Sequence, residues 1–339
     1  MKFGKWFGLI LLLIALYVLW RIRQVLLLVF TAVVLAIPLN RLVRRLQRSG
    51  MQRGVAALLS VTMFLTALLL FVGVIVPPFV DQFQQLVELV PRGLQRLQGW
   101  FFVLQTRLPG VDSFDYVPSF EELTQQARPF VSWVVNNFFA LFSNFLLILL
   151  NLLLILVLTT MLLVNPTPYR QGFIAFFPAF YRPRVDSILT DCEAALIGWI
   201  RGVLIDMAVI GTVVALGLWI LRVPLVLANA ALAGLLEAIP NIGPTLSLVP
   251  PLAIALLDAP WKAVAVVVFY IVIQQLEQYL LVPVVMQKQV SLLPAVTLLA
   301  QVVFAAFFGF LGLLLAIPLV IVGQIVIREA LIHDVLDRW

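Results

Sequence analysis

The chain has 339 residues, of which 63% are apolar and only 11% are charged, and its mean hydropathy is +1.11. Soluble domains carry about 25% charged residues, so this composition excludes a soluble globular fold and predicts an all-α polytopic membrane protein. The net charge of +6 comes from arginines that cluster in loops, and we therefore expect a lipid bilayer and no nucleic acid among the partners. With one cysteine, one histidine and no P-loop motif, the sequence predicts no cofactor, no metal site and no enzyme.

Apolar runs predict about eight transmembrane helices, because roughly 20 apolar residues cross a bilayer. The first two runs are only about 22 Å long as helices, so we expect them to form a tight hairpin around Arg21 and Arg23. The last run is too long for one upright helix and should break near Gly309, Gly312 and Pro318. The runs cover residues 6–20, 25–39, 54–77, 135–164, 203–221, 224–257, 262–284 and 293–327.

Arginine counts in short loops predict the orientation of the chain. The loop 40–53 holds five arginines and no acid, which places it in the cytoplasm and, with eight crossings, both termini as well. These boundaries divide the chain into six segments. They are a transmembrane hairpin with the third span (1–78), an amphipathic extracytoplasmic insert (79–133), the fourth span (134–164), a cytoplasmic amphipathic segment (165–202), a C-terminal transmembrane core (203–328) and a cytoplasmic tail (329–339).

The insert contains a heptad-like stripe of apolar residues from Phe83 to Leu108. One interpretation is an amphipathic helix that lies on the transmembrane core or at the membrane interface. The other is self-association through this stripe, which would make the protein a homo-oligomer.

The most informative segment is the run 234–247, where a carboxylate and two prolines interrupt an apolar stretch. Glu237 precedes Pro240 by one turn, and a regular helix cannot continue through Pro240 and Pro244. A broken helix at membrane depth needs burial in protein or a wet cavity, and a carboxylate there indicates a functional site. We predict that this break binds a cation or proton and a polar solute; the alternative is a kink that only shapes packing. The candidate residues are Glu237, Pro240, Asn241, Gly243, Pro244, Thr245 and Ser247.

A second polar group lies in the run 262–284. Gln274 and Gln278 share a helix face, as do Gln274 and Glu277, and such a group cannot face lipid. We interpret these three residues as part of a transport path, with interhelical hydrogen bonding as the alternative. Asp206 lies close to Arg201 on the expected helix, and the sequence favours an interfacial ion pair between them.

Several motifs, taken in order, resemble the autoinducer-2 exporter (AI-2E) family of transporters. The motifs are Gly198–Gly202, Leu235–Pro244, Gln275–Gln278, Val290–Pro294 and Gly309–Gly312. The resemblance implies an eight-span secondary transporter in a prokaryotic plasma membrane, linked to export of autoinducer-2 or to sodium/proton exchange. Val203 and Leu293 stand where many members have glutamine and histidine, so substrate and proton-relay detail do not transfer.

Together these features predict a gradient-driven transporter of a small polar solute, coupled to a proton or to sodium. In this hypothesis, ion loading of Glu237 shifts the balance between inward-open and outward-open states. Two other classes remain open, an oligomeric passive channel and a membrane scaffold without flux.

Overall fold

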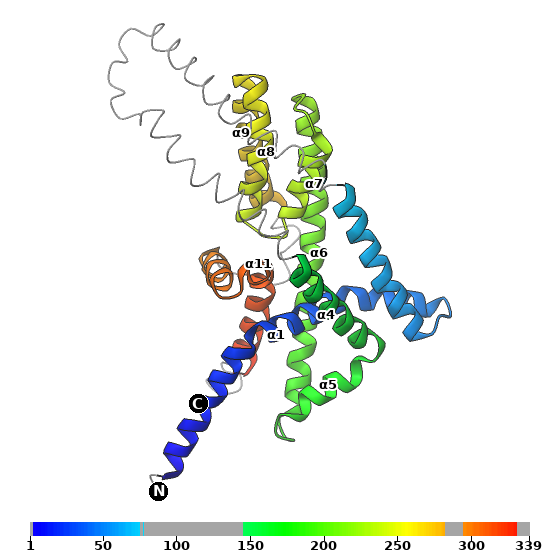
Figure 1. The fold of residues 1–339 in the computed structure, drawn as a ribbon, viewed down its shortest axis with the longest axis vertical. Coiled ribbons are helices and arrows are strands. Elements are labelled where there is room, and N and C mark those ends of the chain that lie inside the picture. Colours follow the sequence, from blue (N-terminus) through cyan, green and yellow to red (C-terminus); the bar gives the residue numbers. More distant parts are fainter. Residues whose placement is uncertain (1–2, 75–76, 78–144, 282–293, 331–339) are drawn as a thin grey trace. The chain divides into compact units, whose positions relative to one another are not determined.

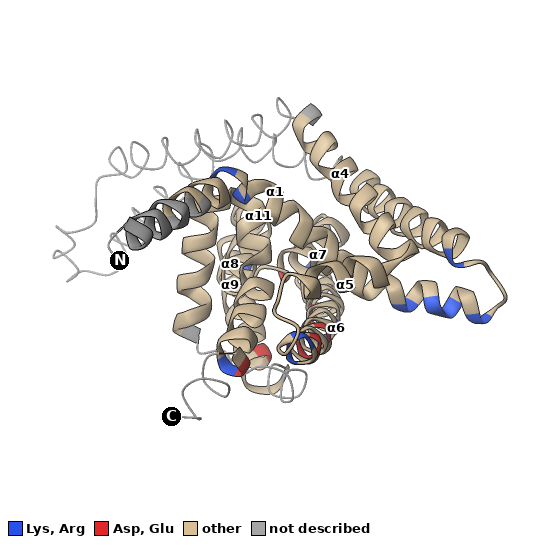
Figure 2. Cartoon of the chain, turned by 90° about the horizontal axis from the view of Figure 1, so that it is seen from below, with Lys and Arg blue, Asp and Glu red and all other residues tan. Residues whose placement is uncertain are grey.

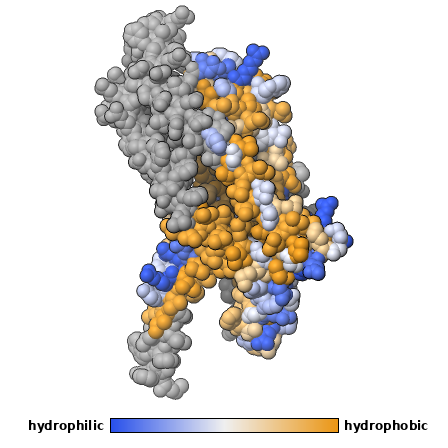
Figure 3. Space-filling model, turned by 45° about the vertical axis from the view of Figure 1, so that its right-hand side comes forward, coloured by the Kyte–Doolittle hydropathy of each residue, from blue (hydrophilic) through white to orange (hydrophobic). Residues whose placement is uncertain are grey.

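The computed structural model describes residues 3–74, 77, 145–281 and 294–330, and these residues form helices and short turns (Figure 1). Within these described ranges, six helices are long and apolar enough to cross a membrane. Apolar side chains cover much of the face seen in Figure 3, which is the surface that lipid requires. The protein is therefore a polytopic helical membrane protein. The six candidates are Tyr17–Arg48, Arg53–Val74, Leu147–Val164, Arg182–Ile220, Pro260–Leu280 and Ala295–Ala330.

The predicted amino-terminal hairpin is wrong, because α1 runs without a break from Phe3 to Arg48. Arginine and glutamine are good helix formers, so the polar residues 21–24 do not turn the chain. The Arg23 guanidinium lies over the Trp20 ring at 4.1 Å from its centre, which gives this charge a place on the helix surface. At 1.5 Å per residue α1 is roughly 69 Å long, more than twice a hydrocarbon core. One helix therefore replaces two predicted spans.

The chain forms two compact units that alternate along the sequence. The first comprises Met1–Ala67, Leu150–Val203 and Val284–Trp339, and the second comprises Leu68–Leu149 and Leu204–Pro283. The insert 79–133, with its stripe from Phe83 to Leu108, lies outside the described residues. Figure 2 shows long stretches of helix without any charged residue, as expected of helices in lipid.

In the first unit, α1 packs against the helix Arg53–Val74 and α4 (Phe145–Val164) around the buried Val43, Ala57 and Leu163. Arg53 closes this arrangement, because its Nε donates to the Leu163 carbonyl at 3.0 Å and its Nη2 to Asn40 Oδ1 at 3.4 Å. The last carbonyls of a helix have no partner within it, so an arginine at the end of α4 satisfies one of them.

The helix α11 (Pro294–Val326) breaks at Gly309, as the sequence predicts. Gly309 has φ 66° and ψ −146°, a conformation open essentially to glycine alone. Pro318 lies inside the second half and does not interrupt it. A Cβ on Gly312 would meet the Phe304 carbonyl oxygen at 2.1 Å, so the two halves approach each other closely after the break.

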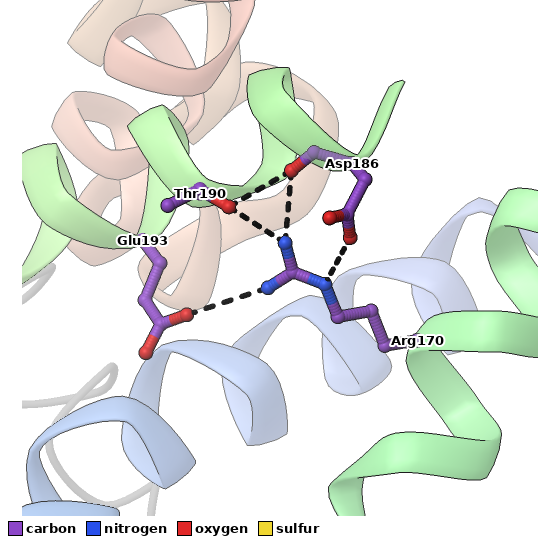
Figure 4. A network of polar contacts seen from close by, with 4 residues as sticks. All are labelled: Arg170, Asp186, Thr190 and Glu193. Atoms are coloured by element: carbon purple, nitrogen blue, oxygen red, sulfur yellow. Dashed lines mark hydrogen bonds and ion pairs between the residues drawn. The ribbon is translucent and has the colours of Figure 1, made fainter. Parts of the chain in front are cut away.

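One arginine joins the short helix α5 (Pro166–Ala175) to α6 (Arg182–Ile220). Arg170 Nε donates to Asp186 Oδ1 at 2.7 Å, and its Nη2 donates to Thr190 Oγ1 at 2.7 Å (Figure 4). Its Nη1 lies 3.7 Å from a Glu193 carboxylate oxygen. A single guanidinium therefore meets three successive turns of the same face of α6.

We expect Arg170→Ala to loosen α5 from α6 and to expose the connecting turn, where Phe176 and Phe180 are already 89% and 86% exposed. Exposed ion pairs contribute about 0.2–1 kcal/mol each, so limited chymotrypsin cleavage in the turn should accelerate about fivefold. Arg201→Ala removes an exposed arginine from the same helix and should leave the rate unchanged. Equal cleavage of Arg170→Ala and wild type would show that the network does not hold α5.

The second unit contains the helices that surround the predicted break. The break itself is confirmed, because α7 (Val226–Leu236) and α8 (Ile242–Asp258) are separate helices joined by the turn 237–241. The single crossing 224–257 is wrong, since α7 and α8 pack side by side as a hairpin. They are about 16 and 25 Å long, and each is too short to cross a core of about 30 Å.

Both ends of this hairpin lie on the same side. Lys262 Nζ, just after α8, donates to the carbonyl oxygen of Arg222, just before α7, at 3.3 Å. The following helix α9 (Pro260–Leu276) packs against α8 and continues into the π-helix η1 (Glu277–Leu281). The turn 237–241 is therefore the tip of a re-entrant hairpin, the kind of backbone that membranes tolerate only inside protein or beside water.

Candidate functional site

The hairpin tip is built by backbone hydrogen bonds between the end of α7 and the start of α8. Ile242 N–H donates to the Pro240 carbonyl and Gly243 N–H to the Ile239 carbonyl, both at 2.8 Å. Asn241 enters α8 with φ 67° and ψ −45°, close to the rare and strained γ-turn that the bond from Ile242 to the Pro240 carbonyl closes. The tip is thus a closed turn whose first amide groups already have partners.

Gly243 is required by the close approach of the two helices at this turn. A Cβ at this position would lie 1.9 Å from the Leu236 carbonyl oxygen and 2.5 Å from its carbonyl carbon. Both atoms are backbone, so they cannot move aside without opening the turn. The glycine therefore permits the contact that places Glu237 at the tip.

Glu237 is the C-cap of α7, and its side chain is buried with 4% exposure. No N–H or hydroxyl group of the described residues donates to its Oε2 atom. The Glu237 carboxyl instead lies within hydrogen-bonding contact of the Glu277 carboxyl, at the start of η1. Gln274 Nε2 donates to Glu277 Oε2 at 3.0 Å. The structure thus joins the two polar groups that the sequence singles out separately.

Asp206, on α6, belongs to this group as well, and the predicted Arg201–Asp206 ion pair is wrong. Asp206 is buried with 6% exposure, and its Oδ1 has no hydrogen-bond partner among the described residues. No ion pair in the described part of the chain joins it to Arg201, which is exposed. Its carboxyl is instead within electrostatic reach of Glu277 and Glu237. The sequence did not predict that Asp206 belongs to the acidic group, because Arg201 lies close to it along the same helix.

The hydroxyl groups of the tip are used locally rather than aimed at Glu237. Thr245 is exposed and donates to the Asn241 carbonyl at 3.0 Å, while buried Ser247 donates to the Pro244 carbonyl at 2.9 Å. Tyr270, on α9, donates to the Ser247 carbonyl at 3.3 Å and ties α9 to α8. Both hydroxyls thus donate to backbone carbonyls of the hairpin itself.

The remaining candidates divide by exposure. Asn241 and Gln278 are exposed, Pro244 and Gly243 are buried, and Pro240 is half-buried at the turn. Among the described residues of the second unit the cations are Arg222 and Lys262, at the opposite end of the hairpin. Lys262 pairs there with Asp258. Within the described part of the second unit, the acidic group at the tip therefore has no cationic side chain to neutralise it.

Gln274 and Gln278 share a helix face in the sequence but differ in the structure, because Gln274 donates to Glu277 and Gln278 is exposed. We expect Gln274→Leu to slow ion-coupled flux about tenfold, because it removes the donor that holds Glu277 Oε2, and a hydrogen bond to a charged group contributes about 1.5–3 kcal/mol. Gln278→Leu removes an exposed amide and should change flux less than twofold. Flux assays on both variants in liposomes check this, and equal effects would contradict a positioning role for Gln274.

Comparison with known proteins shows which family this sequence matches. The family model described as "AI-2E family transporter" matches residues 9–332, nearly the whole chain. The chain belongs to the AI-2E transporter family. The match confirms the resemblance seen in the motif order, and it identifies a membrane transporter family rather than an enzyme family.

Relatives of this AI-2E family member carry transport names. "Putative transport protein YhhT" and "Putative permease PerM", both of Escherichia coli (strain K12), are each 27% identical to it. The alignments cover 87% of this chain and 81% of YhhT, and 88% of this chain and 85% of PerM. "Putative transport protein YueF" of Bacillus subtilis (strain 168) is 29% identical over 43% of this chain and spans 39% of YueF. This chain is therefore a multi-pass membrane protein of a transporter family with bacterial relatives.

Proposed function

We propose that this AI-2E family member is a gradient-driven transporter of a small polar solute, with Glu237 and Glu277 as the groups that bind the coupling ion. The observation that carries the proposal is Glu237 itself, a carboxyl that is 4% exposed at the tip of a re-entrant hairpin and has no cationic partner among the described residues. A charge buried in this way is costly unless an ion or proton neutralises it.

The coupling follows from the difference between the loaded and unloaded site. With a proton or sodium ion bound, the carboxyl pair is neutralised and the packed hairpin is favourable. Without it, two carboxylates repel each other in a desolvated place, and a conformation that lets water reach Glu237 gains in population. Loading and release therefore bias the two access states, and a solute that binds one state better moves with the ion.

Within this proposal the other tip residues have different tasks. Gln274 positions Glu277, and Pro240, Gly243 and Pro244 shape the turn. The exposed Asn241 and Thr245 are the groups available to contact the solute. Ser247 accepts from Tyr270 through its carbonyl and keeps α8 against α9. Gln278 is exposed and lies at the edge of the path.

Autoinducer-2 is the first solute to test, because the family name refers to it, and sodium/proton exchange is the second activity. Assembly as a homo-oligomer depends on the stripe from Phe83 to Leu108, outside the described residues. A cytoplasmic loop 40–53 and cytoplasmic termini stay predictions for a prokaryotic plasma membrane. The prediction for the amino terminus assumes that the chain crosses the membrane twice before the loop 40–53. If α1 crosses only once, the amino terminus lies on the opposite side of the membrane from this loop.

The test uses full-length protein in liposomes with imposed proton or sodium gradients. Wild type should take up autoinducer-2, or exchange sodium for protons, in a saturable and gradient-dependent way. Glu237→Gln should lose the gradient dependence. Unaltered ion-coupled flux in that variant would remove Glu237 from the mechanism, and flux that ignores all gradients in wild type would support a passive channel.

A further inference from the structure

Asp206 has the properties of an active group rather than a structural one. It lies on α6, a different helix from Glu237 and Glu277, and its side chain is more than nine-tenths buried. Its Oδ1 has no hydrogen-bond partner among the described residues, although the Glu277 carboxyl is within electrostatic reach. A buried carboxylate oxygen without a partner costs free energy that folding alone does not repay.

We propose that Asp206, Glu277 and Glu237 form a three-carboxyl proton relay across α6, α9–η1 and α7, so that the coupling ion is the proton. This inference rests on the proposed function and specifies its ion. Glu237 and Glu277 contact each other directly, and both lie within electrostatic reach of Asp206.

The contact between Glu237 and Glu277 is what selects a proton. An ionised carboxylate only accepts hydrogen bonds, so two carboxyl groups in hydrogen-bonding contact share one proton. Transfer is balanced, since one O–H bond breaks on the donor carboxylic acid as one O–H bond forms on the acceptor carboxylate. The same step between Asp206 and Glu277 needs a short approach or one bridging water.

In the described part of the chain, no cationic side chain compensates this acidic group. Among the described residues, the titratable side chains that face it are Tyr270 and Glu277 from α9–η1, Glu237 from α7 and Asp206 from α6. From α8, Ser247 contributes a carbonyl that accepts from Tyr270. Lys262 lies 15 positions before Glu277, about 22 Å along the helix, and it is held by Asp258 and the Arg222 carbonyl. Protons are therefore the charges that can balance three adjacent acids here.

Infrared spectroscopy of the full-length protein in liposomes tests the relay without a transport assay. We expect wild type to show protonated-carboxyl absorption that titrates with pH and shifts in D₂O. Asp206→Asn should remove one component and move the pH interval in which the remaining components titrate. Asp206→Glu keeps a titrating group and should retain three components, which also covers the case in which the asparagine variant does not fold. Asp258→Asn, at the far end of the hairpin, should leave the bands as in wild type.

Two results would overturn the relay. One is a carboxyl spectrum of folded Asp206→Asn that matches wild type at every pH. The other is loss of the protonated bands when sodium chloride replaces choline chloride at fixed pH, which would make sodium the ligand. Neither depends on the solute, so the relay can fail while Glu237→Gln still abolishes coupled flux, and the two ideas are separable.

Discussion

Gly243→Ala is expected to destabilise the protein by about 3 kcal/mol or more, because overpacking against an immobile group is among the most damaging single changes. The added methyl group would lie 1.9 Å from the Leu236 carbonyl oxygen, and relief requires the tip of the α7–α8 hairpin to open. Thermal unfolding in detergent, followed by the loss of monodisperse protein, measures the effect. We expect a fall in the midpoint of several degrees and loss of flux.

Gly172→Ala is the matched control, since nothing lies within 4 Å of a Cβ at that position and it stands in the helix α5. Alanine is favoured over glycine in a helix by about 0.5–1 kcal/mol, so this variant should be as stable as wild type or slightly more stable. A Gly243→Ala variant that unfolds like Gly172→Ala would contradict the closed turn and the position of Glu237 that depends on it.

The second large effect is on transport rather than stability. Glu237→Gln should lower ion-coupled flux about 100-fold, equivalent to about 2.7 kcal/mol, because the amide keeps the size of the side chain but cannot bind or release a proton. Folding should be preserved, since a neutral side chain replaces one that is buried without a cationic partner among the described residues. Initial rates in liposomes under an imposed proton gradient give the number, and the melting midpoint checks folding.

The control for this variant is Asp258→Asn, at the other end of the same hairpin. Asp258 is 48% exposed and pairs with Lys262, so neutralising it should alter flux less than twofold. If both substitutions reduced flux equally, the effect would reflect net charge in the hairpin rather than the site at its tip.

The break at 237–241 could be predicted because its cause is local. Pro240 and Pro244 prevent a continuous helix whatever surrounds them, and Glu237 marks the place as more than a kink. The folding back of α7 on α8 could not be predicted in the same way. An apolar run of this length fits a broken span and a re-entrant hairpin equally well, and only packing between distant residues distinguishes them.

The same limit explains why the predictions for Asp206 and for the amino-terminal hairpin were wrong. Asp206 has an arginine nearby on its own helix, whereas its actual neighbours Glu237 and Glu277 are 31 and 71 positions away and come together only through helix packing. In α1, the polar residues Arg21 and Arg23 interrupt an apolar run, and this drop in hydropathy led to the prediction of a turn. The backbone continues through them because neither residue breaks a helix.

The most direct test of the central claim measures protons and solute together in one set of liposomes. Liposomes that contain the wild-type protein are given labelled autoinducer-2 on one side of the membrane and a pH-sensitive dye inside. Potassium and valinomycin clamp the membrane potential. A downhill solute gradient should drive a proton flux with a fixed ratio to the solute, and Glu237→Gln should abolish the proton flux. Saturable solute flux with no accompanying proton movement in wild type would contradict a proton-coupled site at the hairpin tip.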